Sequence, residues 1–181
     1  MRPTVKLSLL PLALLALAAC APRAAAQSGE AAQKPYKLEG HEVKVAAAVA
    51  FADGGDRLLP GSEKALDAVK AYLDDRQSVT TLRVEAHTDA GVDGAAGQAL
   101  SERRALAVAR RLVEKGVDCK RLVPVGFGGT KPVAPDDSPE NRAKNRRVAF
   151  VNAALRGRLI GGMPADGGGR AAGDPCGKSR Q

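Results

Sequence analysis

The chain has 181 residues and a formal net charge of +8, and its length allows one domain of ordinary size with tails. The basic balance favours an anionic neighbour, such as nucleic acid, phospholipid or cell-wall carboxylates. With no tryptophan, three phenylalanines and two tyrosines, the chain lacks an aromatic platform for stacking bases, so we do not expect nucleic acid as a partner.

The amino-terminal residues have the pattern of an export signal. Two basic residues, Arg2 and Lys6, flank the start of an apolar run at residues 7–18. This run is shorter than the ~20 residues that a membrane-spanning helix requires. Residues 1–19 are therefore predicted to form a signal peptide.

The apolar run ends in the sequence LAAC, which resembles the lipobox of bacterial lipoproteins. The resemblance implies cleavage before Cys20 and acylation of its sulfur and amino groups, with palmitate among the attached chains. Several chains anchor a protein stably, because each buried methylene contributes roughly 0.8 kcal/mol. Ala21, in place of aspartate, implies sorting to the outer membrane. The alternative is an ordinary secretory signal in which Cys20 is incidental.

The two ends of the mature chain differ in composition from its middle. Residues 20–40 are small, polar and interrupted by proline, and residues 157–181 are glycine-rich without apolar periodicity. We expect a lipidated flexible tether at 20–40 and a disordered tail at 157–181. The folded domain is expected at 41–156.

Within the domain, the hydrophobic pattern predicts strands alternating with helices. Strands are expected where β-branched or alternating apolar residues occur, at 43–51, 79–87, 121–129 and 147–155. Helices are expected from helical spacing and capping residues, at 62–73, 100–115 and 137–147. This order predicts an α+β fold, β-α-β-α-β-(α)-β, with a four-stranded mixed sheet and helices packed on one side.

Two cysteines remain besides Cys20. Cys119 and Cys176 are able to form a disulfide in an exported protein. However, Cys176 lies in the glycine-rich tail, where pairing is permitted but not required. Both the paired and the free state stay open.

The sequence His87-Thr88-Asp89 raises the possibility of an enzyme, a cell-wall hydrolase using His87 and Asp89. However, the only other histidine is His41, and a zinc site needs three or four clustered ligands. General acid–base catalysis also needs a positioned partner, which this pattern does not offer. We therefore expect no enzyme, no metal and no cofactor. The hydrolase and a nonspecific polyanion-binding protein are kept as alternatives.

Asp89 and Arg104 form the more informative pair. Asp89 stands at the end of a predicted strand, and Arg104 lies fifteen residues later, in the first turns of the next helix. A helix amino end favours anions, and a guanidinium adds a bidentate grip on a carboxylate. Asp89 supplies the opposite pole, for an ammonium group. Together they predict a receptor for a zwitterion.

Four motifs stand in the order and spacing of one known family. They are HTD, LSERRA, GFG…KP and NRRV, and with them residues 43–153 resemble the OmpA-like peptidoglycan-binding domain. Outer-membrane protein A, peptidoglycan-associated lipoprotein and flagellar stator proteins share this domain. The resemblance implies that Asp89 and Arg104 bind meso-diaminopimelate of the peptide stem, that Arg146 contacts the stem, and that Thr88 belongs to the same site.

Three positions depart from the family pattern. Gly97 replaces a usual asparagine, Val92 a usual glycine, and Gly54 a usual polar residue. Each lost polar contact costs about 1 kcal/mol, the net worth of a hydrogen bond. The charge pair is retained, so we expect binding that is weaker or uses altered backbone contacts.

The expected function is that of an outer-membrane lipoprotein on the periplasmic face, which binds peptidoglycan non-covalently and tethers membrane to cell wall. The lipid on Cys20 would bind the membrane, and the pocket of Asp89, Arg104 and Arg146 would bind the stem peptide. By the same resemblance, proteins of the Tol system are possible further partners.

Overall fold

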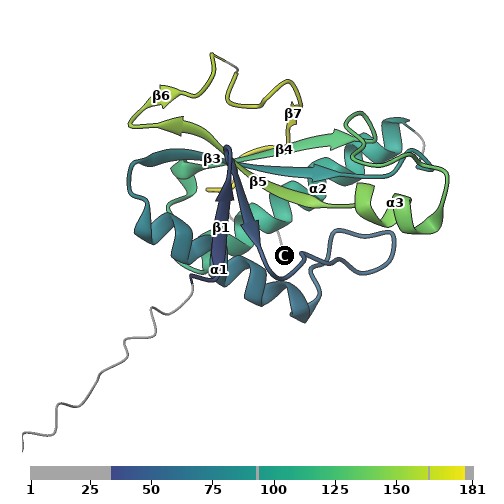
Figure 1. Cartoon of the computed structure of the whole chain (residues 1–181), viewed down its shortest axis with the longest axis horizontal. Coiled ribbons are helices and arrows are strands. Elements are labelled where there is room, and N and C mark those ends of the chain that lie inside the picture. The colour runs from purple at the N-terminus through teal and green to yellow at the C-terminus, as the bar shows by residue number, and fades with distance from the viewer. Residues whose placement is uncertain (1–33, 93, 163, 178–181) are drawn as a thin grey trace, which may run out of the picture. The chain divides into compact units, whose positions relative to one another are not determined.

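The computed structural model describes residues 34–92, 94–162 and 164–177 (Figure 1). The predicted signal peptide, Cys20 and the tether up to residue 33 lie outside the described residues. In the described part, no helix is long and apolar enough to traverse a bilayer. The strands are β1 (Tyr36–Glu39), β2 (Glu42–Val45), β3 (Val79–His87), β4 (Leu122–Gly128), β5 (Val148–Leu155), β6 (Arg158–Leu159) and β7 (Arg170–Ala171), and the α-helices are α1 (Glu63–Asp75), α2 (Gly94–Glu114) and α3 (Pro139–Asn145).

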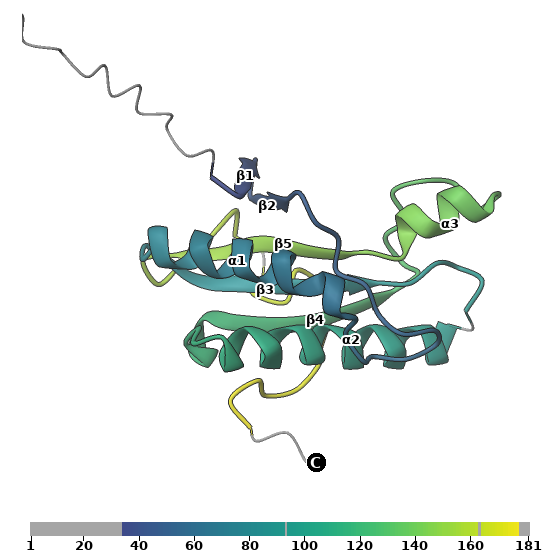
Figure 2. The same ribbon diagram turned by 90° about the horizontal axis from the view of Figure 1, so that it is seen from below.

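Strand β3 lies at the centre of a mixed seven-stranded sheet. It runs antiparallel to β5 and parallel to β4. The order across the sheet is β1-β2-β5-β3-β4-β7, and β6 pairs with β5. Helices α1 and α2 cover one face of the sheet, and α3 lies beyond the amino-terminal end of β5 (Figures 1 and 2). The predicted α+β class is confirmed. The sheet exceeds the predicted four strands, because β1, β6 and β7 come from segments expected to lie outside the domain.

The hydrophobic core lies between the sheet and helices α1 and α2. On β3, Leu82, Val84 and Ala86 are fully buried, as the alternating pattern predicted. The helices contribute apolar residues at helical spacing, namely Leu66, Val69, Leu73, Val108 and Leu112. Burying each such side chain stabilises the fold by roughly 1.5–3 kcal/mol, so this face fixes how the helices sit on β3.

A β-hairpin precedes the expected start of the domain. Strands β1 and β2 pair antiparallel around Gly40, whose φ of +58° suits glycine. Tyr36 is buried, packs edge-on against Tyr72 with 5.1 Å between ring centroids, and donates its hydroxyl hydrogen to Asp75. The prediction of a tether up to residue 40 is therefore wrong from Tyr36 onward. Composition did not reveal that α1 offers Tyr36 a buried site.

The first predicted strand, 43–51, is too long. Strand β2 ends at Val45, and its register with β5 contains one pair, Glu42 with Val151. Beyond Val45 come three alanines, whose short side chains give a strand little to pack. The chain therefore leaves the sheet at this point and continues towards α1.

Helix α2 begins at Gly94, six residues before the predicted start at 100. Gly97 is buried in its first turns, where an added Cβ would stand 3.1 Å from the Thr88 hydroxyl oxygen. Glycine disfavours helices in isolation, but here its small size allows the helix to pack on the end of β3, so packing overrides propensity. As predicted, the helix ends near Gly116, which has a φ of +95°.

Residues 164–177, here called the C-terminal strap, are part of the fold. Strand β7 pairs antiparallel with β4, and Cys176 forms a disulfide with Cys119. A Cβ on Gly169 would lie 2.4 Å from the Val125 side chain, so this close approach requires glycine. The prediction of a disordered tail is wrong for the described residues. Glycine contacts and a cross-link hold the strap, and neither leaves an apolar repeat in the sequence.

Candidate functional site

Asp89 lies just after β3 and is 6% exposed. Its Oδ2 accepts a hydrogen bond from Nη1 of Arg146 at 2.6 Å, and its Oδ1 accepts one from the backbone N–H of Gly91 at 3.1 Å. The Arg146 side chain is 45% exposed. The buried carboxylate is thus held by a guanidinium that remains accessible to solvent.

Arg146 also lines a cavity of about 270 Å³, here called the arginine cavity. Its walls come from the segment between β2 and α1, from the end of β3, from α2 and from the junction of α3 with β5. The lining residues are Val49, Ala50, Phe51, Ala52, Asp53, Gly54, His87, Arg104, Arg146 and Arg147. Three guanidinium groups around so small a volume favour a bound anion.

Arg104 enters the arginine cavity from α2. Its Nε donates to the Gly55 carbonyl oxygen at 2.8 Å, and its guanidinium lies 4.9 Å from the centre of the Phe51 ring. Burial lowers the pKa of Arg104, and the positive charge of Arg146 lowers it further. Its terminal nitrogens form no hydrogen bond within the described part of the chain. They are therefore available to a carboxylate, which would also relieve the repulsion between the arginines.

The structure brings three of the predicted site residues together. Arg104 and Arg146 line the arginine cavity, and Asp89 lies behind Arg146 rather than in the wall. Thr88 is not in the wall either: its N–H donates to the Gly128 carbonyl at 2.9 Å, and its buried hydroxyl lacks a partner in the described ranges. Thr88 thus fixes the backbone next to Asp89.

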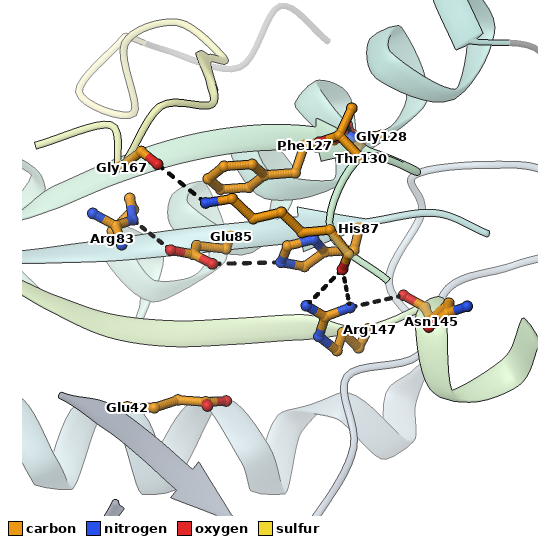
Figure 3. A network of polar contacts seen from close by, with 12 residues as sticks. Glu42, Arg83, Glu85, His87, Phe127, Gly128, Thr130, Asn145, Arg147 and Gly167 are labelled. Carbon is orange, nitrogen blue, oxygen red and sulfur yellow. Dashed lines mark hydrogen bonds and ion pairs between the residues drawn. The ribbon is translucent and has the colours of Figure 1, made fainter. Parts of the chain in front are cut away.

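Arg147 lines the cavity but was not predicted as a site residue. Its Nη1 and Nη2 each donate to the Lys131 carbonyl oxygen at 3.2 Å, and burial lowers its pKa (Figure 3). These bonds hold it against the loop after β4. The one sequence signal for Arg147 was its place beside Arg146, which does not indicate the direction of its side chain.

His87 also lines the cavity, from its buried side. Its ring stacks on Phe127 with 5.1 Å between centroids, and Nε2 lies 3.4 Å from Glu85 without hydrogen-bond geometry (Figure 3). Burial lowers the pKa of His87, although the nearby Glu85 carboxylate opposes this shift. The Asp89 carboxylate is bonded to Arg146 and not to His87. These contacts do not form a catalytic His–Asp pair.

No cluster of three potential metal ligands occurs among the residues that the structure describes. Of the three departures from the family pattern, Gly54 lines the arginine cavity with a φ of +64°. At Gly97 a larger residue would have to displace the Thr88 hydroxyl or Val92, which would lie 3.1 and 3.5 Å from its Cβ. The substitutions therefore alter the rim and one buried contact, while the charged groups remain in place.

Comparisons with known proteins agree with this fold. Residues 50–146 match the model of the OmpA family. The outer-membrane lipoprotein YfiB of Pseudomonas aeruginosa is 37% identical over 114 residues, which cover 62% of this chain and 67% of YfiB. The peptidoglycan-binding protein ArfA of Mycobacterium tuberculosis is 36% identical over 107 residues, covering 57% of this chain but only 31% of ArfA. A solved MotB-like protein from Desulfovibrio vulgaris has a TM-score of 0.54 and 28% identity, over 64% of this chain and 75% of that one.

Proposed function

This chain belongs to the OmpA family, and on that premise we propose that it binds peptidoglycan without catalysis, through meso-diaminopimelate of the stem peptide. The observation that carries the proposal is that Arg104 and Arg146 line one cavity and that Asp89 lies directly behind Arg146, to which it is bonded. The free end of diaminopimelate bears an ammonium and a carboxylate on one carbon, and Asp89 and the two arginines are groups of opposite charge to each. ArfA, whose name describes it as peptidoglycan-binding, supports the assignment.

Binding proceeds by exchange of partners at Asp89. In the free protein Arg146 neutralises this carboxylate. The ligand ammonium takes its place, and the released Arg146 then joins Arg104 in holding the ligand carboxylate. Charge-assisted hydrogen bonds of this kind are roughly twice as strong as neutral ones, so the exchange retains strong contacts on both sides. Thr88 supports the site by fixing the backbone beside Asp89.

The protein is further proposed to be an outer-membrane lipoprotein, anchored by lipid at Cys20 and facing the periplasm. The LAAC sequence and the similarity to YfiB, an outer-membrane lipoprotein, support this anchor. The protein then tethers the outer membrane to the wall. Replacing Cys20 by alanine is expected to remove the protein from the outer-membrane fraction while leaving sacculus binding intact. Recovery of the variant in the outer membrane would contradict the anchor.

The cavity is tested by co-sedimentation with purified sacculi. Asp89→Asn and Arg104→Gln are each expected to weaken binding at least ~10-fold, because a hydrogen bond to a charged group contributes roughly 1.5–3 kcal/mol. Arg103→Gln is the matched control, since Arg103 is a neighbouring exposed arginine whose ion pair with Asp56 spans 3.9 Å. Parent-like binding by both cavity variants would overturn the assignment. Release of soluble muropeptides would instead indicate a hydrolase.

A further inference from the structure

One side of β5 is open near the arginine cavity. The His87 N–H donates to the Arg147 carbonyl on the β3 side, and the Asn152 N–H donates to the His41 carbonyl on the β2 side. Backbone groups alternate between the two sides of a strand, so the N–H and C=O of Val148 face the β2 side. The register of β2 with β5 contains one pair, at Val151. Within the described residues, Val148 therefore has no strand partner on this side.

A second chain segment runs past this open stretch. Figure 2 shows the chain leaving β2 towards the loop before α1, while β5 continues towards α3. Residues 46–49 alternate between exposed and half-buried, which is the pattern of an extended chain. Their backbone groups form no hydrogen bond within the described ranges. Three of these four residues are alanines, which take up little space.

Between these two segments lies a cavity of about 350 Å³, here called the β5 groove. Its lining comprises Glu42, Val43, Lys44, Val45, Ala46, Ala47, Ala48, Val49, Ala143, Arg146, Arg147, Val148 and Phe150. Val49, Arg146 and Arg147 line the arginine cavity as well, so the two spaces adjoin. A ligand whose free diaminopimelate end fills the arginine cavity therefore has a path for its main chain along β5.

We propose that the β5 groove binds the main chain of the stem peptide in an extended form, as an added strand on the open edge of β5. This inference rests on the proposed function of the arginine cavity. Strand addition draws affinity from main-chain hydrogen bonds, which Val148 is placed to make. Alanine walls suit the small methyl side chains of alanine residues in the stem. Arg146 and Arg147 give the groove a positive charge that complements stem carboxylates, whereas Lys44 is paired with Glu42 at 2.7 Å.

The experiment compares two ligands by calorimetric titration of the full chain. One is free meso-diaminopimelate, and the other is the stem tetrapeptide L-Ala-γ-D-Glu-meso-diaminopimelate-D-Ala. The parent protein is expected to bind the tetrapeptide at least ~10-fold more tightly. Ala143→Phe places a ring in the groove from an exposed position on α3, and is expected to abolish this advantage while changing the affinity for the free amino acid less than about twofold. Ala99→Phe, at an exposed position on α2, is the control and is expected to keep the advantage.

Hydrogen exchange provides a readout at the proposed contact. The amide of Val148 is expected to exchange more slowly with the tetrapeptide bound than with free diaminopimelate bound. Equal affinity of the parent for both ligands, or an unchanged advantage in Ala143→Phe, would overturn the groove and leave the arginine cavity standing. If neither ligand binds the parent, the proposed function fails and the groove assignment fails with it.

Discussion

The β4 side and the β5 side of the central strands differ in how far the rest of the chain covers them. On the β4 side, β7 adds a paired strand, a disulfide joins Cys119 to Cys176, and glycine brings the C-terminal strap within contact of Val125 and Phe127. On the β5 side, β2 pairs at one position and then departs, leaving backbone groups and a groove. One side is closed by the chain itself, and the other stays open beside the arginine cavity.

This difference shows where the fold can leave an edge unpaired. An open strand edge invites pairing with other chains, so proteins usually cover it. Here the side without a proposed ligand is covered, and the open stretch is short and next to basic residues. The proposed ligand arrives at this open stretch of β5, while β7 pairs with β4 on the opposite side.

Removing the disulfide, which helps to close the β4 side, is expected to have the largest effect on stability. The cross-linked cysteines are 57 residues apart, and closing a loop of that size stabilises a protein by about 2–4 kcal/mol. Cys119→Ser with Cys176→Ser should lower the unfolding free energy by this amount in urea titrations. Affinity for diaminopimelate should change less than about twofold, because the strap does not line the arginine cavity. A large loss of affinity would show that the two sides are coupled.

Two substitutions that each enlarge a small side chain, one on each side, sharpen the comparison with a smaller effect. Gly169→Ala forces a Cβ to 2.4 Å from Val125 and 2.8 Å from Phe127, so overpacking is expected to cost about 1–3 kcal/mol. Ala48→Val adds two methyl groups at an exposed position on the open side and should change stability by less than about 0.5 kcal/mol. Thermal unfolding measures both variants. Equal costs would mean that the open side is as tightly packed as the closed one.

The sequence predicted the parts of the site that depend on local pattern. Alternation along β3 placed Asp89 at a strand end, and the structure confirms that position. Arg104 lies on the following helix as predicted, but in its middle and not in its first turns, because α2 begins at Gly94; the predicted contribution of the helix amino end at Arg104 is therefore wrong. Resemblance to the family added Arg146, which holds Asp89. That Arg146 occupies this carboxylate in the free protein was not foreseen, because the pairing joins residues 57 positions apart.

The sequence-based predictions that were wrong concern mainly contacts that leave no local pattern in the sequence. The strap is fixed by glycines that approach Arg83 and Val125 and by a disulfide that the sequence left open. The early end of β2 has a different cause, because three alanines with little to pack follow Val45 and the register with β5 contains one pair. The early start of α2 depends on the fit of Gly97 against Thr88. The strap depends most on a partner distant in the chain, since Cys119 and Cys176 are 57 positions apart.

Tyr36 has a mechanical consequence if the protein is the proposed tether. A pull from the membrane would enter the domain at the start of β1, where Tyr36 pairs with Val45. The hairpin would then open one pair at a time from that end. The hydroxyl of Tyr36 and the ammonium of Lys34 both bind Asp75 on α1, so the load passes directly into a helix of the core. In such a tether, Tyr36 would slow the opening of the hairpin and so keep the tension from reaching the peptide site.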